Sequence, residues 1–150
     1  LVARLGPDLL VEMLEVRQAL GPLIGRLAAE HAVPEDLDEL RDALRGVESA
    51  GSAVERQAAD LDFFGLLIHA THNRALSLLF RWVASAYGGR THELTPALES
   101  ADVVLEGLTD IYDAVSGRRS VDAADAVESY LRDSAARMIE AYLHSQVAHR

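Results

Sequence analysis

The sequence predicts an all-α fold, an antiparallel bundle of six or seven helices, on three observations. Apolar residues recur at steps of three and four along most of the 150 residues, which is the period of a helix with one buried face. Prolines, serines and glycines mark helix starts and ends at short intervals. No stretch alternates apolar and polar side chains for long enough to form a convincing strand. The short connectors favour sequential neighbours in a single domain.

The first helix is expected over Pro7–His31. Its apolar stripe consists of Leu9, Leu10, Met13, Leu14, Leu20, Leu23, Ile24 and Leu27. Because proline lacks a backbone N–H donor, a kink or a break is predicted at Gly21-Pro22. The second helix should run over Pro34–Val47, since proline suits the first turn of a helix.

The next two helices are predicted from their caps. Ser52 followed by Glu55 matches a capping box, so the third helix is expected over Ala53–Ala70. Asn73 can cap a fourth helix, which should end at Gly88-Gly89. The apolar positions of this fourth helix are Leu76, Leu79, Phe80, Val83 and Tyr87.

The last two helices close the bundle. Thr95-Pro96 combines a cap with a first-turn proline and begins a fifth helix that reaches about Ser116. Gly117 stands where a left-handed C-terminal cap is wanted. A long final helix should span Ser120–His144. Its stripe consists of Val121, Ala124, Val127, Leu131, Ala135, Met138 and Tyr142.

Composition and charge exclude several functions. The chain has no cysteine, which removes disulfides, thiolate metal sites and thiol catalysis and fits a reducing cytoplasm. Its formal net charge of −10 leaves no basic face, so we expect no nucleic-acid binding by this chain itself. In the most apolar region, the longest run without charged, amide or imidazole groups is Phe63–Ile68, far shorter than the ~20 residues of a membrane span. The start at Leu1 suggests part of a longer protein.

No enzyme motif is present in the sequence. It contains no phosphate loop, dinucleotide fingerprint, zinc-protease motif or nucleophile elbow. His69 and His72 lie three residues apart and are possible metal ligands. The simpler interpretation is that one packs or caps and the other is solvated, because a metal site needs three or four converging ligands.

One carboxylate stands out beside the apolar third helix. Asp60 lies four residues before Phe64 and therefore on the same face. If that face is interior, Asp60 needs a partner, for which Arg17 on the first helix is the candidate. An Arg17 that snorkels at the edge of its stripe fits the pattern equally well. Tyr112 and Tyr130 are expected near the core, and they line a pocket only if Asp60 and Arg17 share it.

Three segments together resemble the C-terminal ligand-binding domain, the FCD domain, of FadR-type regulators in the GntR family. Residues 9–44 carry Glu15-Val16-Arg17 on an apolar helix followed by a proline-started second helix. Residues 58–80 place Asp60 three positions before a phenylalanine and open the next helix with Asn73. Residues 110–131 form a closing helix pair with a short turn. The resemblance spans nearly the whole chain.

The resemblance implies a domain with defined partners. Six or seven helices would surround a central effector cavity, and the domain would form a homodimer. An N-terminal winged helix-turn-helix domain, absent from this chain, would bind operator DNA. Residues 1–150 would then be the effector-binding and dimerisation domain of a transcription regulator rather than an enzyme.

The resemblance also implies a site without a metal or cofactor. Many members hold a divalent metal through one aspartate and three histidines. Asp60 matches the aspartate, but Phe64, Leu108 and Tyr130 stand at the three histidine positions. A lone carboxylate does not retain such a metal.

These replacements imply an apolar effector. Phe64 and Leu108 add hydrocarbon to the cavity, which favours a fatty acid or acyl-CoA over a small sugar acid. Arg17 would hold a ligand carboxylate or phosphate, and Asp60 would orient Arg17 or accept a hydroxyl. Tyr112 and Tyr130 are the candidate hydrogen-bond donors.

Other functions remain open from the sequence. A helical dimerisation scaffold that has lost ligand sensing would have a filled interior. A small helical enzyme with Asp60 or His69 as its base lacks a visible nucleophile–base–orienter set. An effector domain of the tetracycline-repressor type is a competing helical regulator. The helix order and the Glu15-Val16-Arg17 opening argue against it.

Overall fold

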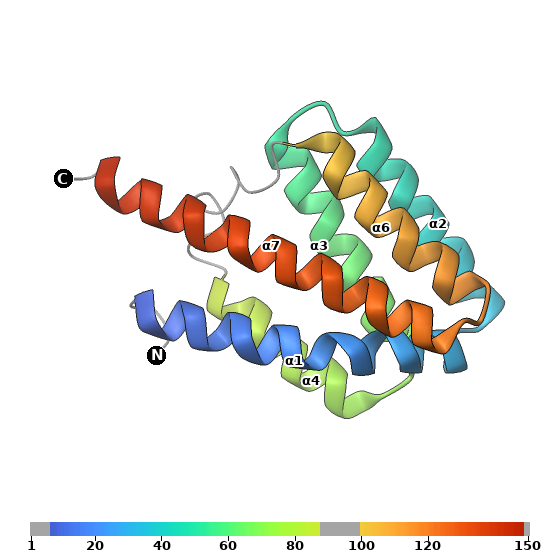
Figure 1. The fold of residues 1–150 in the computed structure, drawn as a ribbon. Helices are drawn as coiled ribbons and strands as arrows, with labels where there is room; N and C mark the ends of the chain where they lie inside the picture. Colours follow the sequence, from blue (N-terminus) through green and yellow to red (C-terminus); the bar gives the residue numbers. More distant parts are fainter. Residues whose placement is uncertain (1–6, 88–99, 149–150) are drawn as a thin grey trace.

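The computed structural model describes residues 7–87 and 100–148, and all the regular elements in them are α-helices. They are α1 (Pro7–His31), α2 (Pro34–Ser49), α3 (Ala53–Ala70), α4 (Arg74–Tyr87), α6 (Ala101–Ser116) and α7 (Ser120–Ala148). The all-α prediction is confirmed. Figure 1 shows α1 and α7 as a long antiparallel pair beside α2, α3 and α6. None of these helices combines the length and hydropathy that crossing a membrane requires.

Helix starts follow the capping signals in the sequence. The Ser52 hydroxyl accepts a hydrogen bond from the Glu55 amide at 3.2 Å, and α3 begins at the next residue. The Asn73 side-chain oxygen accepts a hydrogen bond from the Leu76 amide at 3.0 Å at the start of α4. Pro34 opens α2, as expected.

Of the kink or break predicted at Gly21-Pro22, the break is wrong, because α1 continues through Pro22 without interruption. The expectation of a left-handed Gly117 is wrong as well. The left-handed residue after α6 is Arg118, with φ 58°, whereas Gly117 keeps a right-handed φ of −79°. Helix α6 still ends at Ser116, as expected, and the left-handed residue follows Gly117 instead of being Gly117 itself. The Arg118 guanidinium donates a hydrogen bond to the Ala29 carbonyl at 3.3 Å, which fixes this turn against the end of α1.

Other differences concern helix extent and exposed positions. Helix α7 continues past His144 to Ala148. The predicted boundaries at Gly88-Gly89 and Thr95-Pro96 lie outside the described residues. Three side chains that were placed on buried stripes are exposed instead: Leu9, Leu79 and Val121.

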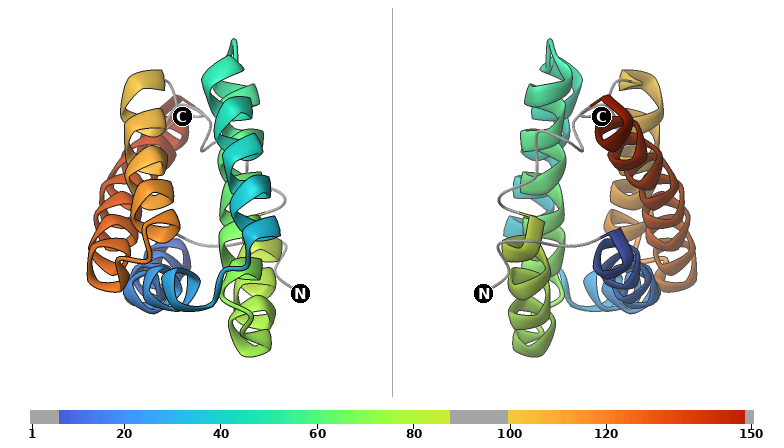
Figure 2. Two further views of the ribbon diagram at one scale, coloured as in Figure 1. Left: turned by 90° about the vertical axis from the view of Figure 1, so that its right-hand side faces the viewer. Right: turned by 90° about the vertical axis from the view of Figure 1, so that its left-hand side faces the viewer.

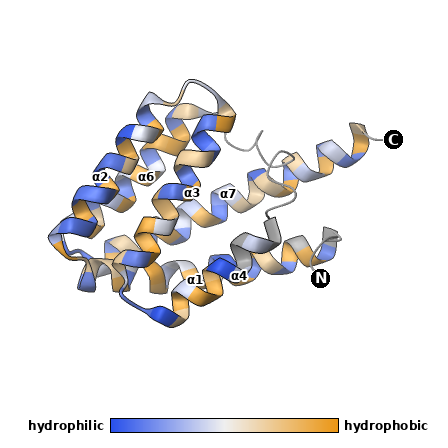
Figure 3. Ribbon diagram, turned by 180° about the vertical axis from the view of Figure 1, so that it is seen from behind, coloured by the Kyte–Doolittle hydropathy of each residue, from blue (hydrophilic) through white to orange (hydrophobic). Residues whose placement is uncertain are grey.

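One large hydrophobic cluster draws on all six helices of the described part of the chain. Figure 2 shows α6 and α7 on one side and α2, α3 and α4 on the other, with α1 in the lower part of the molecule beside α4. In Figure 3 the outward turns of α2 are mostly hydrophilic. A smaller cluster of Leu14, Ala135 and Tyr142 joins the projecting ends of α1 and α7.

A glycine fixes the close approach of α1 to α7. A Cβ atom on Gly25 would lie 2.3 Å from the Ala123 carbonyl oxygen, a separation that no side chain allows. The backbones of the two helices therefore touch at this crossing. A side chain at residue 25 would therefore force α1 and α7 apart at this crossing.

Candidate functional site

Asp60 is a carboxyl group enclosed in the hydrophobic core. It lies on α3, is 4% exposed, and accepts a hydrogen bond from the Tyr130 hydroxyl of α7. Burial raises the pKa of Asp60 above its ordinary value of 3.8, against the opposing effects of this hydrogen bond and of the charges on Arg17 and Arg137. Asp60 therefore holds its proton more readily than an exposed aspartate does.

Tyr130 is held between two neighbouring helices. Its ring stacks on Phe64 of α3, with centroids 5.5 Å apart and planes 26° from parallel. A Cβ atom on Gly107 of α6 would lie 2.5 Å from the Tyr130 ring, so the tyrosine occupies space that only glycine leaves free. Burial, reinforced by the nearby Asp60, raises the pKa of the Tyr130 hydroxyl well above its usual range. The hydroxyl therefore remains a hydrogen-bond donor to Asp60.

Arg17 is a buried cation on α1. It is 6% exposed, so it does not snorkel to the surface. Its guanidinium donates a hydrogen bond to the Ser134 hydroxyl of α7 at 3.2 Å. The charge on Arg17 lowers the pKa of Asp60, but the hydrogen bond to that carboxyl comes from Tyr130. The structure thus brings Arg17 close to Asp60 and gives Asp60 a different direct partner.

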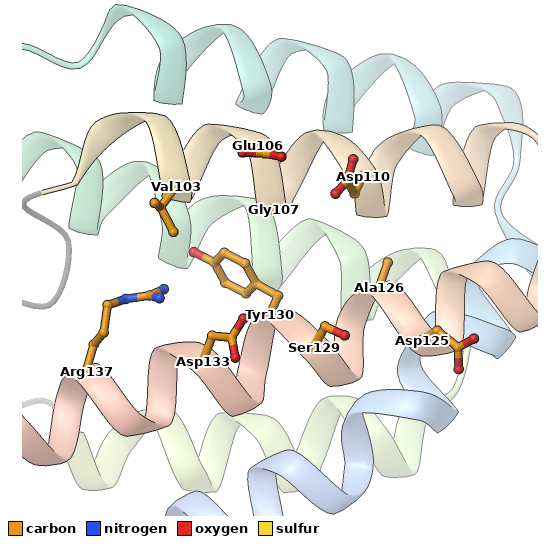
Figure 4. Close-up of a pocket in the computed structure, with 10 residues that line it drawn as sticks. All are labelled: Val103, Glu106, Gly107, Asp110, Asp125, Ala126, Ser129, Tyr130, Asp133 and Arg137. Carbon is orange, nitrogen blue, oxygen red and sulfur yellow. The ribbon is translucent and has the colours of Figure 1, made fainter.

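A pocket of about 450 Å³ opens between α6 and α7, within the range of small-molecule sites. Figure 4 shows Val103 and Gly107 on its α6 wall and Tyr130 and Arg137 on its α7 wall. The buried Nε atom of Arg137 has no hydrogen-bond partner. A buried donor without a partner is costly, which marks this end of the pocket as a place where an acceptor is wanted.

The pocket also contains acidic side chains. Glu106, Asp110, Asp125 and Asp133 line it, and among the described residues of its lining Arg137 is the one cationic side chain. Arg137 was missed in the sequence analysis. Its position seven residues after Tyr130 is the available signal, because residues seven apart share one face of a helix.

Tyr112 lies apart from this cluster. Its hydroxyl accepts a hydrogen bond from the Arg41 side chain of α2 at 3.1 Å, at the contact between α2 and α6. The structure therefore brings together Arg17, Asp60 and Tyr130, with Phe64 stacked on the tyrosine, but does not bring Tyr112 to them.

A second polar cluster forms where α2 begins and α3 ends. The Asp36 carboxylate accepts hydrogen bonds from the Val33 amide at 2.9 Å and from His72 Nε2 at 2.7 Å. His69 Nε2 lies 3.8 Å from the same carboxylate. In the part of the chain that the structure describes, no group of three or more histidine, cysteine, aspartate or glutamate side chains is arranged to hold a metal ion. Both histidines instead surround Asp36.

Comparison with known proteins identifies the family. Residues 12–133 match the FCD domain, so the chain belongs to the FCD domain family. The resemblance to the ligand-binding domain of GntR-type regulators is thereby confirmed at the level of this domain. The chain is also 56% identical over 142 residues to the uncharacterized HTH-type transcriptional regulator Rv0494 of Mycobacterium tuberculosis, strain H37Rv. That match covers 95% of this chain and 59% of the length of Rv0494.

The residues that the resemblance assigns to the family's metal positions do not have the chemistry of metal ligands. Asp60 accepts the hydrogen bond of Tyr130, and Phe64 stacks on that tyrosine. Leu108 is fully buried in the same hydrophobic cluster. One carboxyl group, one phenol that holds its proton and two hydrocarbon side chains cannot supply the nitrogen and oxygen ligands of a zinc-type ion.

Proposed function

We propose that this chain is the effector-binding and dimerisation domain of a DNA-binding transcription regulator. Its effector is an apolar carboxylate or an acyl-CoA-like molecule, bound without a metal or other cofactor. The observation that carries the proposal is the buried cluster of Arg17, Asp60 and Tyr130 beside a pocket lined by Arg137, whose buried Nε atom has no hydrogen-bond partner. The FCD domain match and the name of the relative Rv0494 support a regulatory role.

The chemistry of the cluster suits an apolar anion. Phe64 and Leu108 provide hydrocarbon for an acyl or aromatic group. Two guanidinium groups, Arg17 and Arg137, act on a single Asp60 carboxyl group, so the cluster has a surplus of positive charge. The positive charge of these two guanidinium groups offsets the free-energy cost of moving an anion from water into this region.

The geometry also offers a route from ligand to DNA binding. A ligand between α6 and α7 contacts Tyr130 and shifts its ring against Gly107. Helix α7 is tied to α1 by the Arg17–Ser134 hydrogen bond and by the backbone contact at Gly25. A shift of α7 therefore moves α1, the first helix of this domain. In this proposal the operator is bound by a helix-turn-helix domain that precedes α1 in the full protein.

The remaining partners follow from this role. Helix α4 exposes Leu78, at 64%, and Trp82, at 56%, as expected for a surface that a second copy of the chain covers. We therefore propose a homodimer that acts in the cytoplasm on operator DNA. The chain is proposed to catalyse no reaction, because the described cluster lacks a nucleophile paired with a base.

One observation favours the alternative, a dimerisation scaffold without an effector. Phe64, Leu108 and Tyr130 are buried and pack where a central cavity is implied, and the pocket lies to one side of them, between α6 and α7. A scaffold of this kind would keep the dimer and ignore small molecules.

Native mass spectrometry of the purified chain, with no metal or ligand added, separates the two functions. The proposed function predicts a dimer that carries an organic adduct and no divalent ion. A bare dimer that also takes up neither palmitate nor palmitoyl-CoA on addition would favour the scaffold. A retained divalent ion would contradict the metal-free site.

A further inference from the structure

Arg137 is a cationic residue of the pocket lining whose Nε atom lacks a hydrogen-bond acceptor. It lies on α7 and lines the pocket, and its Nε atom is buried without a hydrogen-bond partner. A guanidinium has five N–H donors in a planar arrangement. It stays positively charged at physiological pH even where it is partly buried. In Figure 4 its side chain extends along the pocket toward Tyr130.

The nearest carboxyl groups do not satisfy Arg137. Asp133, one turn earlier on α7, is the usual position for a helical ion pair, but it lies 3.9 Å from the neighbouring Arg132 instead. Asp60 accepts its hydrogen bond from Tyr130, and Arg137 affects Asp60 only through its charge. The buried Nε atom of Arg137 thus has no protein acceptor, and its side chain lines the pocket.

Arg17 differs from Arg137 in both respects. Arg17 is almost fully buried, is engaged with Ser134, and does not line the pocket. An anion that enters between α6 and α7 therefore meets Arg137 first. The acidic lining residues, Glu106, Asp110, Asp125 and Asp133, oppose an anion everywhere else in the pocket.

We infer that Arg137 binds the anionic head group of the effector, a carboxylate or phosphate-type oxyanion, in the pocket between α6 and α7. This inference rests on the proposed function and moves the anion-binding role from Arg17 to a residue that the family resemblance did not indicate. A planar oxyanion accepts two parallel hydrogen bonds from the guanidinium, and Tyr130 marks the opposite end of the head-group site.

Thermal unfolding with matched ligands tests the inference. The probes are decanoate, decyl phosphate and decan-1-ol, which share a hydrocarbon chain and differ in the head group. The proteins are the wild-type chain, R137Q, R137K and the control R26Q. Arg26 is an exposed residue of α1 that pairs with Glu30, so R26Q makes the same charge change away from the pocket.

We expect the stronger oxyanion ligand to bind R137Q about tenfold to a hundredfold more weakly than wild type, as for the loss of charge-assisted hydrogen bonds. R137K should fall between the two, because it keeps the charge but loses the fork. R26Q should bind as wild type does, and the response to decan-1-ol should not depend on Arg137. Comparison of decanoate with decyl phosphate identifies which oxyanion is preferred.

The possible failures are distinguishable. If decanoate or decyl phosphate stabilises wild type and R137Q equally, the inference is wrong and the proposed function stands. If no probe stabilises the wild-type chain, and palmitate and palmitoyl-CoA also fail, the proposed function is wrong and the inference falls with it. The melting temperature of ligand-free R137Q shows whether the variant is folded. R137K gives an independent readout if R137Q is not.

Discussion

Asp36 and Asp60 are two aspartates with similarly small exposed fractions, yet their pKa values are shifted in opposite directions. Asp36 is 5% exposed and Asp60 is 4% exposed. Burial alone would raise the pKa of Asp36, but hydrogen bonds from the Val33 amide and His72, together with the charges on His72 and His69, bring it below 3.8. Burial raises the pKa of Asp60, and one tyrosine hydroxyl and two arginine charges do not reverse that effect.

Asp60 lies deep in the core and has one direct donor, whereas Asp36 lies at the start of α2 and has several, so depth of burial and direct partners together set the pKa of each carboxyl group. Asp36 has the saturated surroundings of a structural cap at the start of α2. Asp60 has one direct donor, the Tyr130 hydroxyl, and the charge that acts on it from Arg137 belongs to a guanidinium whose buried Nε atom has no partner. A ligand gains binding free energy when it pairs with an unsatisfied polar group. This distinguishes the structural cap at Asp36 from the candidate binding site at Asp60.

The largest expected effect comes from removing each carboxyl group in turn. D60A should lower the free energy of unfolding by about 3–5 kcal/mol, because it leaves the buried Arg17 without a nearby negative group. D36A should cost about 1–2 kcal/mol, since it removes a cap at the end of a helix. Urea unfolding of both variants measures these losses. An equal or larger loss in D36A would show that Asp60 contributes no more to the free energy of unfolding than Asp36 does.

A smaller effect is expected from removing a single hydroxyl. Y130F keeps the stacking on Phe64 but leaves Asp60 without its hydrogen bond, at a cost of about 1–3 kcal/mol. Y112F is the matched control, because the Arg41 partner of Tyr112 is exposed and the loss should stay below about 0.5 kcal/mol. Similar losses in the two variants, measured by urea unfolding, would contradict the distinction between the two tyrosines.

The pH dependence of stability should have opposite signs at the two aspartates. The pKa of Asp60 is raised, so its contribution is fully present below 3.8 and is lost as pH rises through the folded pKa. The pKa of Asp36 is lowered, so its contribution is present above 3.8 and is lost as pH falls through the folded pKa. Each slope is at most about 1.4 kcal/mol per pH unit.

Two isosteric variants isolate these slopes. Above pH 3.8, wild type should lose stability relative to D60N as pH rises. Below pH 3.8, wild type should lose stability relative to D36N as pH falls. Urea unfolding over a pH series provides both comparisons. Slopes of the same sign for the two variants would remove the contrast between the carboxyl groups.

Most of the fold could be predicted because its signals are local. Pro34, Ser52 and Asn73 act on their own helices within one turn, and the structure places the helix starts there. The errors come from long-range packing. Arg118 takes the left-handed position that suits Gly117 because its side chain reaches Ala29 on α1, 89 residues away in sequence. Helical periodicity contains no information about such a contact.

The site was less predictable for the same reason. The spacing of Asp60 and Phe64 puts both side chains on one face of a helix, and the structure shows that this face is interior. It did not reveal that the direct partner of Asp60 is Tyr130, 70 residues further along the chain, rather than Arg17. The position of Tyr112 near an apolar face was correct, yet its hydroxyl turns to Arg41. Which hydroxyl points inward depends on the packing of α6 against α7, which a periodic pattern does not fix.

A carboxyl carbon NMR titration of the chain, without and with decanoate, tests whether the Asp60 cluster is the binding site. We predict that Asp60 titrates above 3.8 and Asp36 below it, and that decanoate changes the signal of Asp60 while leaving that of Asp36 unchanged. Asp60 titrating at or below 3.8, or a ligand response at Asp36 and none at Asp60, would contradict the assignment of the binding site to the Asp60 cluster.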